Sequence, residues 1–176
     1  PHQVVDIRAI HGLIDNSALT NSAIDMPTGD YDADNLSATV VPNRNMILLS
    51  LAIAKAVNIG AARVDYGAHG GDHILYPDCR PEFLEAFLSA ANLGTRDGST
   101  APQEPWWRIR APLVEMTKAQ IIQRATDLGA DLSLTLSCYD PDPEGLACGR
   151  CDSCGLRRRG FEEASIPDPT SYQIDC

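Results

Sequence analysis

The sequence predicts an α/β fold with a doubly wound parallel sheet, followed by a C-terminal region that contains four cysteines. Two observations predict the sheet: β-type segments alternate with helical segments, and a glycine-rich turn follows one of the strands. Strands that alternate with helices form parallel sheets with helices on both faces. With 176 residues, 44% of them hydrophobic and 22% charged, the chain is long enough for a sizeable core.

The charge is strongly acidic, with a formal net charge of -10. Residues 1–40 contain six aspartates against Arg8 alone. A general nucleic-acid binder needs a basic face to neutralise phosphates, so we expect no direct nucleic-acid binding. No apolar run approaches the length of a membrane span, so we expect no membrane segment.

The first part of the chain leads to a buried helix. Val4–Ile10 alternates as a strand does, whereas residues 15–39 are rich in polar residues and are expected to form a long loop, either functional or a solvated insert. The segment Met46–Val57 is apolar on nearly every side and predicts a buried helix, with Asn43 or Asn45 capping its first turn.

Arg44 is an unusual neighbour for so apolar a helix. A guanidinium at a helix start, beside free backbone amides, suits a phosphate or a carboxylate. The alternative is a surface salt bridge to the acidic loop, and spacing alone favours that alternative.

The next strand, Ala62–Ala68, leads into the turn His69–His73. Ligands gather at the C-terminal ends of strands in open α/β sheets. The two histidines and Asp72 suggest a second metal site, but no further ligand follows at a suitable spacing, which favours ordinary loop residues.

Pro81 opens the helix that runs to Ala91, whose inward stripe consists of Phe83, Leu84, Phe87, Leu88 and Ala91. Just before it, Asp78 and Arg80 either pair with each other or serve a site. Cys79 is a candidate nucleophile, but no base is evident nearby, so a buried small residue is favoured.

The last strand is Trp107–Ala111, and a capping box of Thr117 and Gln120 then opens a helix that Gly129 ends. Lys118 falls in the first turn of this helix, where the macrodipole disfavours a cation. An anion bound there and a solvent-exposed lysine are equally good explanations from position alone.

Four cysteines, Cys138, Cys148, Cys151 and Cys154, fall within seventeen positions. Two-residue spacing lets neighbouring thiolates turn onto one ion, so we predict one structural Zn²⁺ with no position left for water. An iron–sulfur cluster is the main alternative, and disulfides are disfavoured. Cysteines used as metal ligands indicate the reducing cytoplasm.

Together the motifs resemble the 7-cyano-7-deazaguanine synthase (QueC) family of the ATP-pyrophosphatase superfamily. The resemblance covers nearly the whole chain and rests on residues 41–45, 67–68, 76–83, 111–113, 117–118 and 137–139 and on the cysteine trio 148–154. One departure is Asn43, where many members have glycine.

The resemblance implies an adenine nucleotide alpha hydrolase-like fold and ATP-dependent conversion of 7-carboxy-7-deazaguanine and ammonia to the nitrile, with Mg²⁺ accompanying ATP. The implied catalytic residues are Lys118, Arg44 and Asp78. The implied substrate-binding residues are Asn43, Asn45, Tyr76 and Arg80. A homodimer is expected. The alternatives are a non-catalytic zinc-bearing binding module and a relative that joins the deazaguanine carboxylate to another amine.

The phosphate loop of the superfamily, Ser-Gly-Gly-x-Asp-Ser, does not occur in this sequence. The expectation is an α/β domain at 1–136 that lacks this loop and a zinc-binding region at 137–176 packed on it. Without the loop's convergent amides, we expect the chain alone not to release AMP and pyrophosphate from ATP. The nucleotide-binding residues therefore stay unknown.

Overall fold

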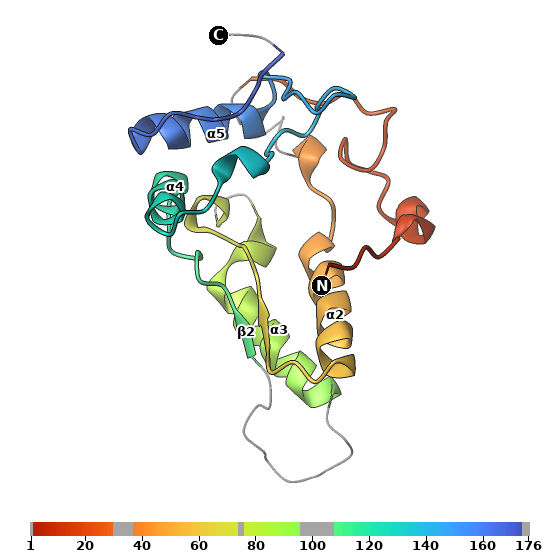
Figure 1. The fold of residues 1–176 in the computed structure, drawn as a ribbon. Helices are drawn as coiled ribbons and strands as arrows, with labels where there is room; N and C mark the ends of the chain where they lie inside the picture. The colour runs from red at the N-terminus through yellow and green to blue at the C-terminus, as the bar shows by residue number, and fades with distance from the viewer. Residues whose placement is uncertain (1, 30–36, 74–75, 96–107, 174–176) are drawn as a thin grey trace. The chain divides into compact units, whose positions relative to one another are not determined.

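The computed structural model describes residues 2–29, 37–73, 76–95 and 108–173 (Figure 1). The chain divides into two compact units, one made of Pro1–Pro42 with Ile122–Cys176 and the other of Asn43–Ile121. The expected domains at 1–136 and 137–176 divide the chain differently and stay a prediction. Trp107 and residues 30–36 of the expected loop lie outside the described residues.

The unit Asn43–Ile121 is built around two paired strands, β1 (Arg63–Asp65) and β2 (Arg108–Arg110). They are parallel, with Val64 opposite Ile109, and the N–H of Tyr66 extends the pairing by donating to the carbonyl of Arg110 at 2.7 Å. A parallel pair needs a crossover connection, and a helix lies between these strands in the sequence. The parallel sheet is therefore confirmed. A doubly wound sheet stays a prediction, because the described residues show only these two paired strands.

Helix α2 (Arg44–Asn58) begins after an asparagine in the left-handed conformation. Asn43 has φ 60°, a region that glycine and asparagine adopt most readily, so asparagine can replace glycine there. The predicted cap is wrong, because neither Asn43 nor Asn45 caps the helix with its side chain. Asp78 caps it from outside: its Oδ2 accepts from the N–H of Asn45 at 3.3 Å.

Only one face of α2 is buried. Asn45, Leu49, Ile53 and Ala56 are buried, whereas Met46, Leu48, Leu51 and Val57 are exposed, so the expectation of burial on nearly every side is wrong for this unit by itself. By length and composition alone, the stretch Ser37–Asn58 is long and apolar enough to cross a membrane, with a mean hydropathy of 1.2. Residues 40–43 within it are not helical, which interrupts any continuous span.

Helices α3 (Pro81–Gly94) and α4 (Lys118–Asp127) follow their predicted bounds closely. In α3 the rings of Phe83 and Phe87 stack with centroids 5.9 Å apart. The capping box of α4 is confirmed, since the N–H of Gln120 donates to Thr117 Oγ1 at 3.2 Å and the N–H of Thr117 donates to Gln120 Oε1 at 2.8 Å. Gly129, with φ 69°, follows the end of α4.

Within its described residues, the other unit contains α5 (Asp152–Glu163), the part of α4 from Ile122 on, and short 3-10 turns at η1 (Arg8–Leu13) and η4 (Leu132–Leu134). The predicted strand Val4–Ile10 is wrong. The carboxylate of Asp6 accepts from the backbone N–H of Arg8 at 2.9 Å, a local bond that closes a turn and competes with an extended chain.

Arg157 holds this unit together from the middle of α5. Its buried guanidinium donates to Asp168 Oδ1 at 3.1 Å, to Thr135 Oγ1 at 2.9 Å and to the carbonyl of Leu132 at 3.2 Å. It also lies 4.9 Å from the ring centroid of Phe161. One side chain therefore ties α5 to η4 and to the segment after the helix.

Asp168 is satisfied on both carboxylate oxygens. The hydroxyl of Tyr172 donates to its Oδ2 at 2.6 Å, and burial together with this carboxylate raises the pKa of Tyr172 to about 12. Burial alone would raise the pKa of Asp168, but hydrogen bonds from Tyr172, Thr170 and Arg157 bring that pKa below its usual value. The carboxylate form is therefore the one that the fold stabilises.

We predict that Arg157→Met lowers the free energy of unfolding by about 3–5 kcal/mol near neutral pH, because it leaves a partly buried carboxylate without its cation. The matched control is Arg124→Met on the exposed face of α4, expected to change it by less than about 0.5 kcal/mol.

Because the pKa of Asp168 is lowered in the folded state, its contribution is present near neutral pH and is lost as the pH falls through that pKa. Chemical denaturation at pH 7 and at about pH 3 should therefore show the deficit of Arg157→Met narrowing in acid. An equal deficit at both pH values would contradict this account of the pair.

Candidate functional site

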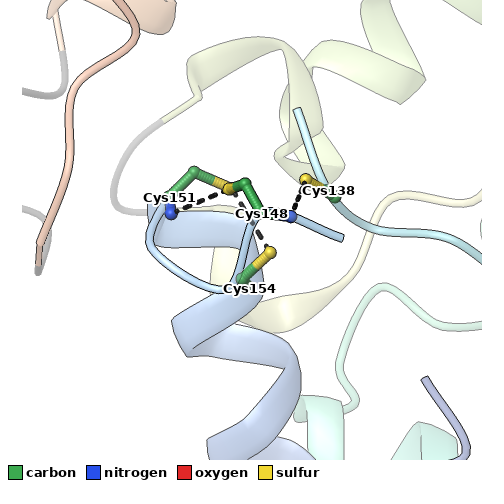
Figure 2. Close-up of side chains that lie close together, drawn as sticks. All are labelled: Cys138, Cys148, Cys151 and Cys154. Carbon is green, nitrogen blue, oxygen red and sulfur yellow. Dashed lines mark hydrogen bonds between the residues drawn. The ribbon is translucent and has the colours of Figure 1, made fainter. Parts of the chain in front are cut away.

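Four cysteine sulfurs converge in the unit that contains α5 (Figure 2). Cys138 comes from the loop after η4, Cys148 and Cys151 from the turn that leads into α5, and Cys154 from the first turn of that helix. All four Sγ atoms lie within 4.8 Å of one another. Such a set of sulfurs could hold a tetrahedral metal ion. The four cysteines therefore lie together as the spacing predicts, and their role as metal ligands stays a prediction.

Backbone amides point at the sulfurs. The N–H groups of Asp140 and Cys148 donate to Cys138 Sγ at 3.3 and 3.2 Å, and the N–H of Cys151 donates to Cys148 Sγ at 3.4 Å. Donors of this kind stabilise thiolate charge and orient the ligands. Cys148, Cys151 and Cys154 are at most 2% exposed, so the group is closed to solvent on most sides.

The turn around the cysteines is held by segments distant in the sequence. Thr28 forms an antiparallel bridge with Cys151, and Ala147 forms a parallel bridge with Tyr172. Arg158 lies 3.9 Å over the ring of Tyr172 and donates to the carbonyl of Gly149 at 3.1 Å. Gly149 has φ 72°, a conformation that suits glycine within a Cys-x-x-Cys turn. The sulfur positions are therefore fixed by the surrounding fold.

Within the part of the chain that the structure describes, the four cysteines are the only group that brings together three or more side chains able to hold a metal ion. The interpretation of the two histidines and Asp72 as ordinary loop residues stays a prediction.

A second group of predicted residues gathers at the start of α2, within the unit Asn43–Ile121. Asp78 accepts from the backbone of Asn45, and the side-chain amide of Asn45 donates to Cys79 Sγ at 3.4 Å. Tyr66 donates from its hydroxyl to the carbonyl of Asp78 at 3.3 Å and lies 3.7 Å from Cys79 Sγ. These contacts fix Asp78 and Cys79 beneath the first turn of α2.

Arg44 and Arg80 each contact an uncharged group within the unit Asn43–Ile121. The guanidinium of Arg44 lies 5.8 Å from the ring centroid of Tyr76, which makes a cation–π contact. Arg80 donates from Nε to the carbonyl of His73 at 2.7 Å, so its contact is with the turn and the alternative pairing with Asp78 is not formed.

Lys118 lies beside His69, with 3.4 Å between Lys118 Nζ and His69 Nε2. The same ring nitrogen lies 3.3 Å from Asp72 Oδ2. Asp72 is joined to the next motif residue, because its carbonyl accepts from the N–H of Tyr76 at 2.8 Å. The lysine is therefore tied to the glycine-rich turn after β1.

The predicted substrate and catalytic residues thus fall into two linked groups. One contains Arg44, Asn45, Tyr76 and Asp78, and the other contains Lys118 with Arg80 near the turn. Tyr66 and His69 were not predicted as site residues. Both lie at the C-terminal end of a predicted strand, where ligands gather in such sheets, and His69 was considered only as a metal ligand.

Comparison with known proteins gives a consistent result. The family model of the queuosine biosynthesis protein QueC matches residues 1–165. The chain is 53% identical over 171 residues to the 7-cyano-7-deazaguanine synthase of Chromohalobacter salexigens, 45% over 172 residues to that of Magnetococcus marinus and 49% over 173 residues to that of Syntrophotalea carbinolica. These matches cover 97–98% of this chain.

The same matches cover less of the relatives. The chain spans 64% of the length of the Chromohalobacter protein, 73% of the Magnetococcus protein and 72% of the Syntrophotalea protein. About a third to a quarter of each relative therefore lies outside the matched region.

We predict that Cys79 reacts slowly with alkylating reagents. Burial raises the pKa of its thiol, and only the thiolate is a good nucleophile, so Cys79 stays protonated at pH 8. Iodoacetamide labelling followed by peptide mass spectrometry should show labelling at least about tenfold slower in the native protein than in denaturant.

Asn45→Ala and Lys55→Ala form a matched pair for this measurement, because Asn45 contacts the sulfur and Lys55 lies exposed on the same helix. Asn45→Ala should speed labelling, and Lys55→Ala should leave it unchanged. Native labelling as fast as in denaturant would show that Cys79 is a reactive thiol after all.

Proposed function

The chain belongs to the QueC family of queuosine biosynthesis proteins, and from this membership we propose that it acts in the ATP-dependent conversion of 7-carboxy-7-deazaguanine and ammonia to 7-cyano-7-deazaguanine. The observation that carries the proposal is the 45–53% identity, over nearly the whole chain, to relatives named 7-cyano-7-deazaguanine synthase. The protein is thus proposed to be a carbon–nitrogen ligase. The alternatives of a non-catalytic module and of a ligase for another amine are not favoured.

The proposed reaction proceeds through two adenylations. A carboxylate oxygen attacks the α-phosphorus of ATP and pyrophosphate leaves. Ammonia then attacks the acyl carbon, AMP leaves and a proton is lost, which gives the amide. The amide oxygen then attacks the α-phosphorus of a second ATP and pyrophosphate leaves. Loss of AMP and two protons from this adenylate gives the nitrile. Each adenylate must be protected from water and its phosphate charge must be met by cations.

The roles of the residues follow from this chemistry and from the local contacts. Lys118 and Arg44 are proposed to face phosphate or carboxylate, since both lie at the start of a helix. Asp78 is proposed to act by fixing the first turn of α2 through the N–H of Asn45.

Asn43, Asn45, Tyr76 and Arg80 are proposed to shape the site of the deazaguanine. Tyr76 offers a ring already in contact with a cation, and Arg80 is oriented by the carbonyl of His73. Convergence of the two linked groups on one pocket is part of this proposal.

The metal proposed for the four cysteines is Zn²⁺. Four sulfurs within 4.8 Å of one another, with amide donors around them, suit a small ion that prefers tetrahedral thiolate ligands. Bound there, zinc would serve the fold by holding the turn to α5, because all four coordination positions are taken by protein. Mg²⁺ is proposed to accompany ATP, as its phosphate oxygens would be its ligands.

We place the protein in the reducing cytoplasm, which suits a cluster of unpaired cysteines, and we propose a homodimer without nucleic-acid contacts. The net charge of -10 supports the absence of general phosphate-backbone binding.

We predict that 7-carboxy-7-deazaguanine and ammonia trigger release of AMP and pyrophosphate in a version of the chain extended by the upstream reading frame, and not in the 176-residue chain alone. In the extended version, Lys118→Ala should lower this turnover by about 10- to 1000-fold because a cation facing phosphate is lost. The chain contains only one other lysine, Lys55, on the exposed side of α2, and Lys55→Ala is the control. The assay compares the 176-residue chain with a version extended by the upstream reading frame, and the nitrile is identified by mass spectrometry. Formation of a different amide in place of the nitrile would contradict the proposal.

We predict about one Zn²⁺ per chain by elemental analysis of the purified protein. Cys151→Ser should lose most of the metal and unfold the unit around α5, whereas Cys79→Ser, which removes a cysteine outside the group, should keep it. Iron with absorbance in the visible range would refute zinc, as would full metal content in Cys151→Ser.

A further inference from the structure

One nitrogen of His69 is approached by two groups of opposite charge. Its Nε2 lies 3.4 Å from the ammonium of Lys118 and 3.3 Å from Oδ2 of Asp72. An ammonium has only hydrogens to offer and a carboxylate has only lone pairs. A single ring nitrogen is therefore able to serve one of them at a time: without a proton it accepts from Lys118, and with a proton it donates to Asp72.

The turn that carries His69 packs closely against the segment before Lys118. The N–H of Gly70 donates to the carbonyl of Met116 at 3.0 Å, which ties the turn to the segment just before Lys118. A side chain at Gly70 would meet the backbone of residues 114–116 at 3.3 Å. A side chain at Gly71 would meet His69 Nδ1 at 3.2 Å. The two glycines thus permit the close approach that brings His69 to the lysine.

The other ring nitrogen of His69, Nδ1, does not determine whether Nε2 pairs with Lys118 or with Asp72. Nδ1 of His69 is buried and has no hydrogen-bond partner among the described residues. The side chain of His69 is 15% exposed and that of Asp72 is 28% exposed, so water competes only weakly for the ring. The state of Nε2 is therefore decided by the competition between Lys118 and Asp72.

We propose that His69 is a positioning residue for Lys118. The neutral imidazole accepts a hydrogen bond from the ammonium through Nε2 and orients it at the start of α4, and protonation of Nε2 replaces this hydrogen bond by one donated to Asp72. The proposal rests on the proposed function only in the clause that Lys118 faces a phosphate or carboxylate of the substrates. The contact itself is a property of the turn and of α4.

The groups around His69 indicate which state prevails near neutral pH. Burial lowers the pKa of His69, Asp72 raises it, and the charges of Lys118 and His73 lower it, with a net shift below the ordinary value. The imidazole is then neutral at pH 7. As the pH falls through the folded-state pKa, below about 6.5, the ring gains a proton and the contact with Lys118 is lost.

The test determines which ring nitrogen of His69 carries the proton. In the 176-residue chain labelled with ¹⁵N-histidine, long-range proton–nitrogen correlation at pH 7.5 should show His69 with its proton on Nδ1 and none on Nε2. Lys118→Met should move the proton to Nε2, where Asp72 accepts it, and the control Lys55→Met should leave the spectrum unchanged. His69→Gln identifies the signal. A proton on Nε2 in the unmodified chain, or a pattern unchanged by Lys118→Met, would overturn the proposal.

An activity measurement separates positioning from general stability. His69→Gln keeps an acceptor for Lys118 and should retain turnover within a few-fold while losing the fall in kcat/KM at acidic pH. His69→Leu removes the acceptor and should lower kcat/KM by about 10- to 100-fold. If both variants lost the same fraction of kcat/KM and both kept its fall at acidic pH, His69 would not be a positioning residue. These variants are made in the version extended by the upstream reading frame. If that version without substitutions forms no nitrile, the proposed function fails, and the nitrogen spectra of the 176-residue chain still decide the role of His69.

Discussion

The convergence of four cysteine sulfurs within 4.8 Å is the constraint on which the unit around α5 depends. The buried cluster there consists of three of these cysteines and Ala147, with Met26, Cys138, Tyr139 and Tyr172 packed against it. Four thiolates so close together repel one another unless a cation neutralises them, and four neutral thiols give a core with little apolar area. With the metal ion proposed for these cysteines, metal binding and folding of this unit would be one equilibrium. The hydrogen bonds of Arg157 stabilise the same unit independently of any metal.

The unit Asn43–Ile121 depends instead on polar contacts beneath the first turn of α2. Asn45 is 5% exposed, and it bonds to Asp78 through its backbone and to Cys79 through its side chain. Replacing such partners singly leaves buried polar groups unsatisfied, which costs more than the bond contributes when made. The Tyr-Pro-Asp-Cys-Arg motif therefore has a structural reason to exist beside any contact with substrate: it fixes where α2 begins and hence where Arg44 lies.

Sequence reasoning succeeded where the signal is local or chemical. Three predictions agree with the structure: the four cysteines lie together, Thr117 and Gln120 form a capping box, and the two strands are parallel. Each follows from short-range geometry or from the repeated alternation of elements. It failed where a distant partner decides the outcome. The cap of α2 comes from Asp78, thirty-three positions away, and His69 meets Lys118 only because the turn packs on the segment before α4. The Val4–Ile10 strand failed for a local reason, the turn closed by Asp6.

The net negative charge of the chain makes the positions of its individual cations important. A protein with a net charge of -10 does not attract nucleotides or carboxylates by its overall field, which at moderate salt is screened within about 10 Å. Anions must then be met by individual cations whose positions are fixed in advance. Three cations each have a neutral group among their contacts: Arg44 lies over the ring of Tyr76, Arg80 donates to the carbonyl of His73, and Lys118 lies against His69. A cation oriented by a neutral partner keeps its full charge for a ligand, whereas one paired with a carboxylate does not. Contacts with neutral neighbours would thus leave these cations available for the anionic substrates proposed for this acidic protein.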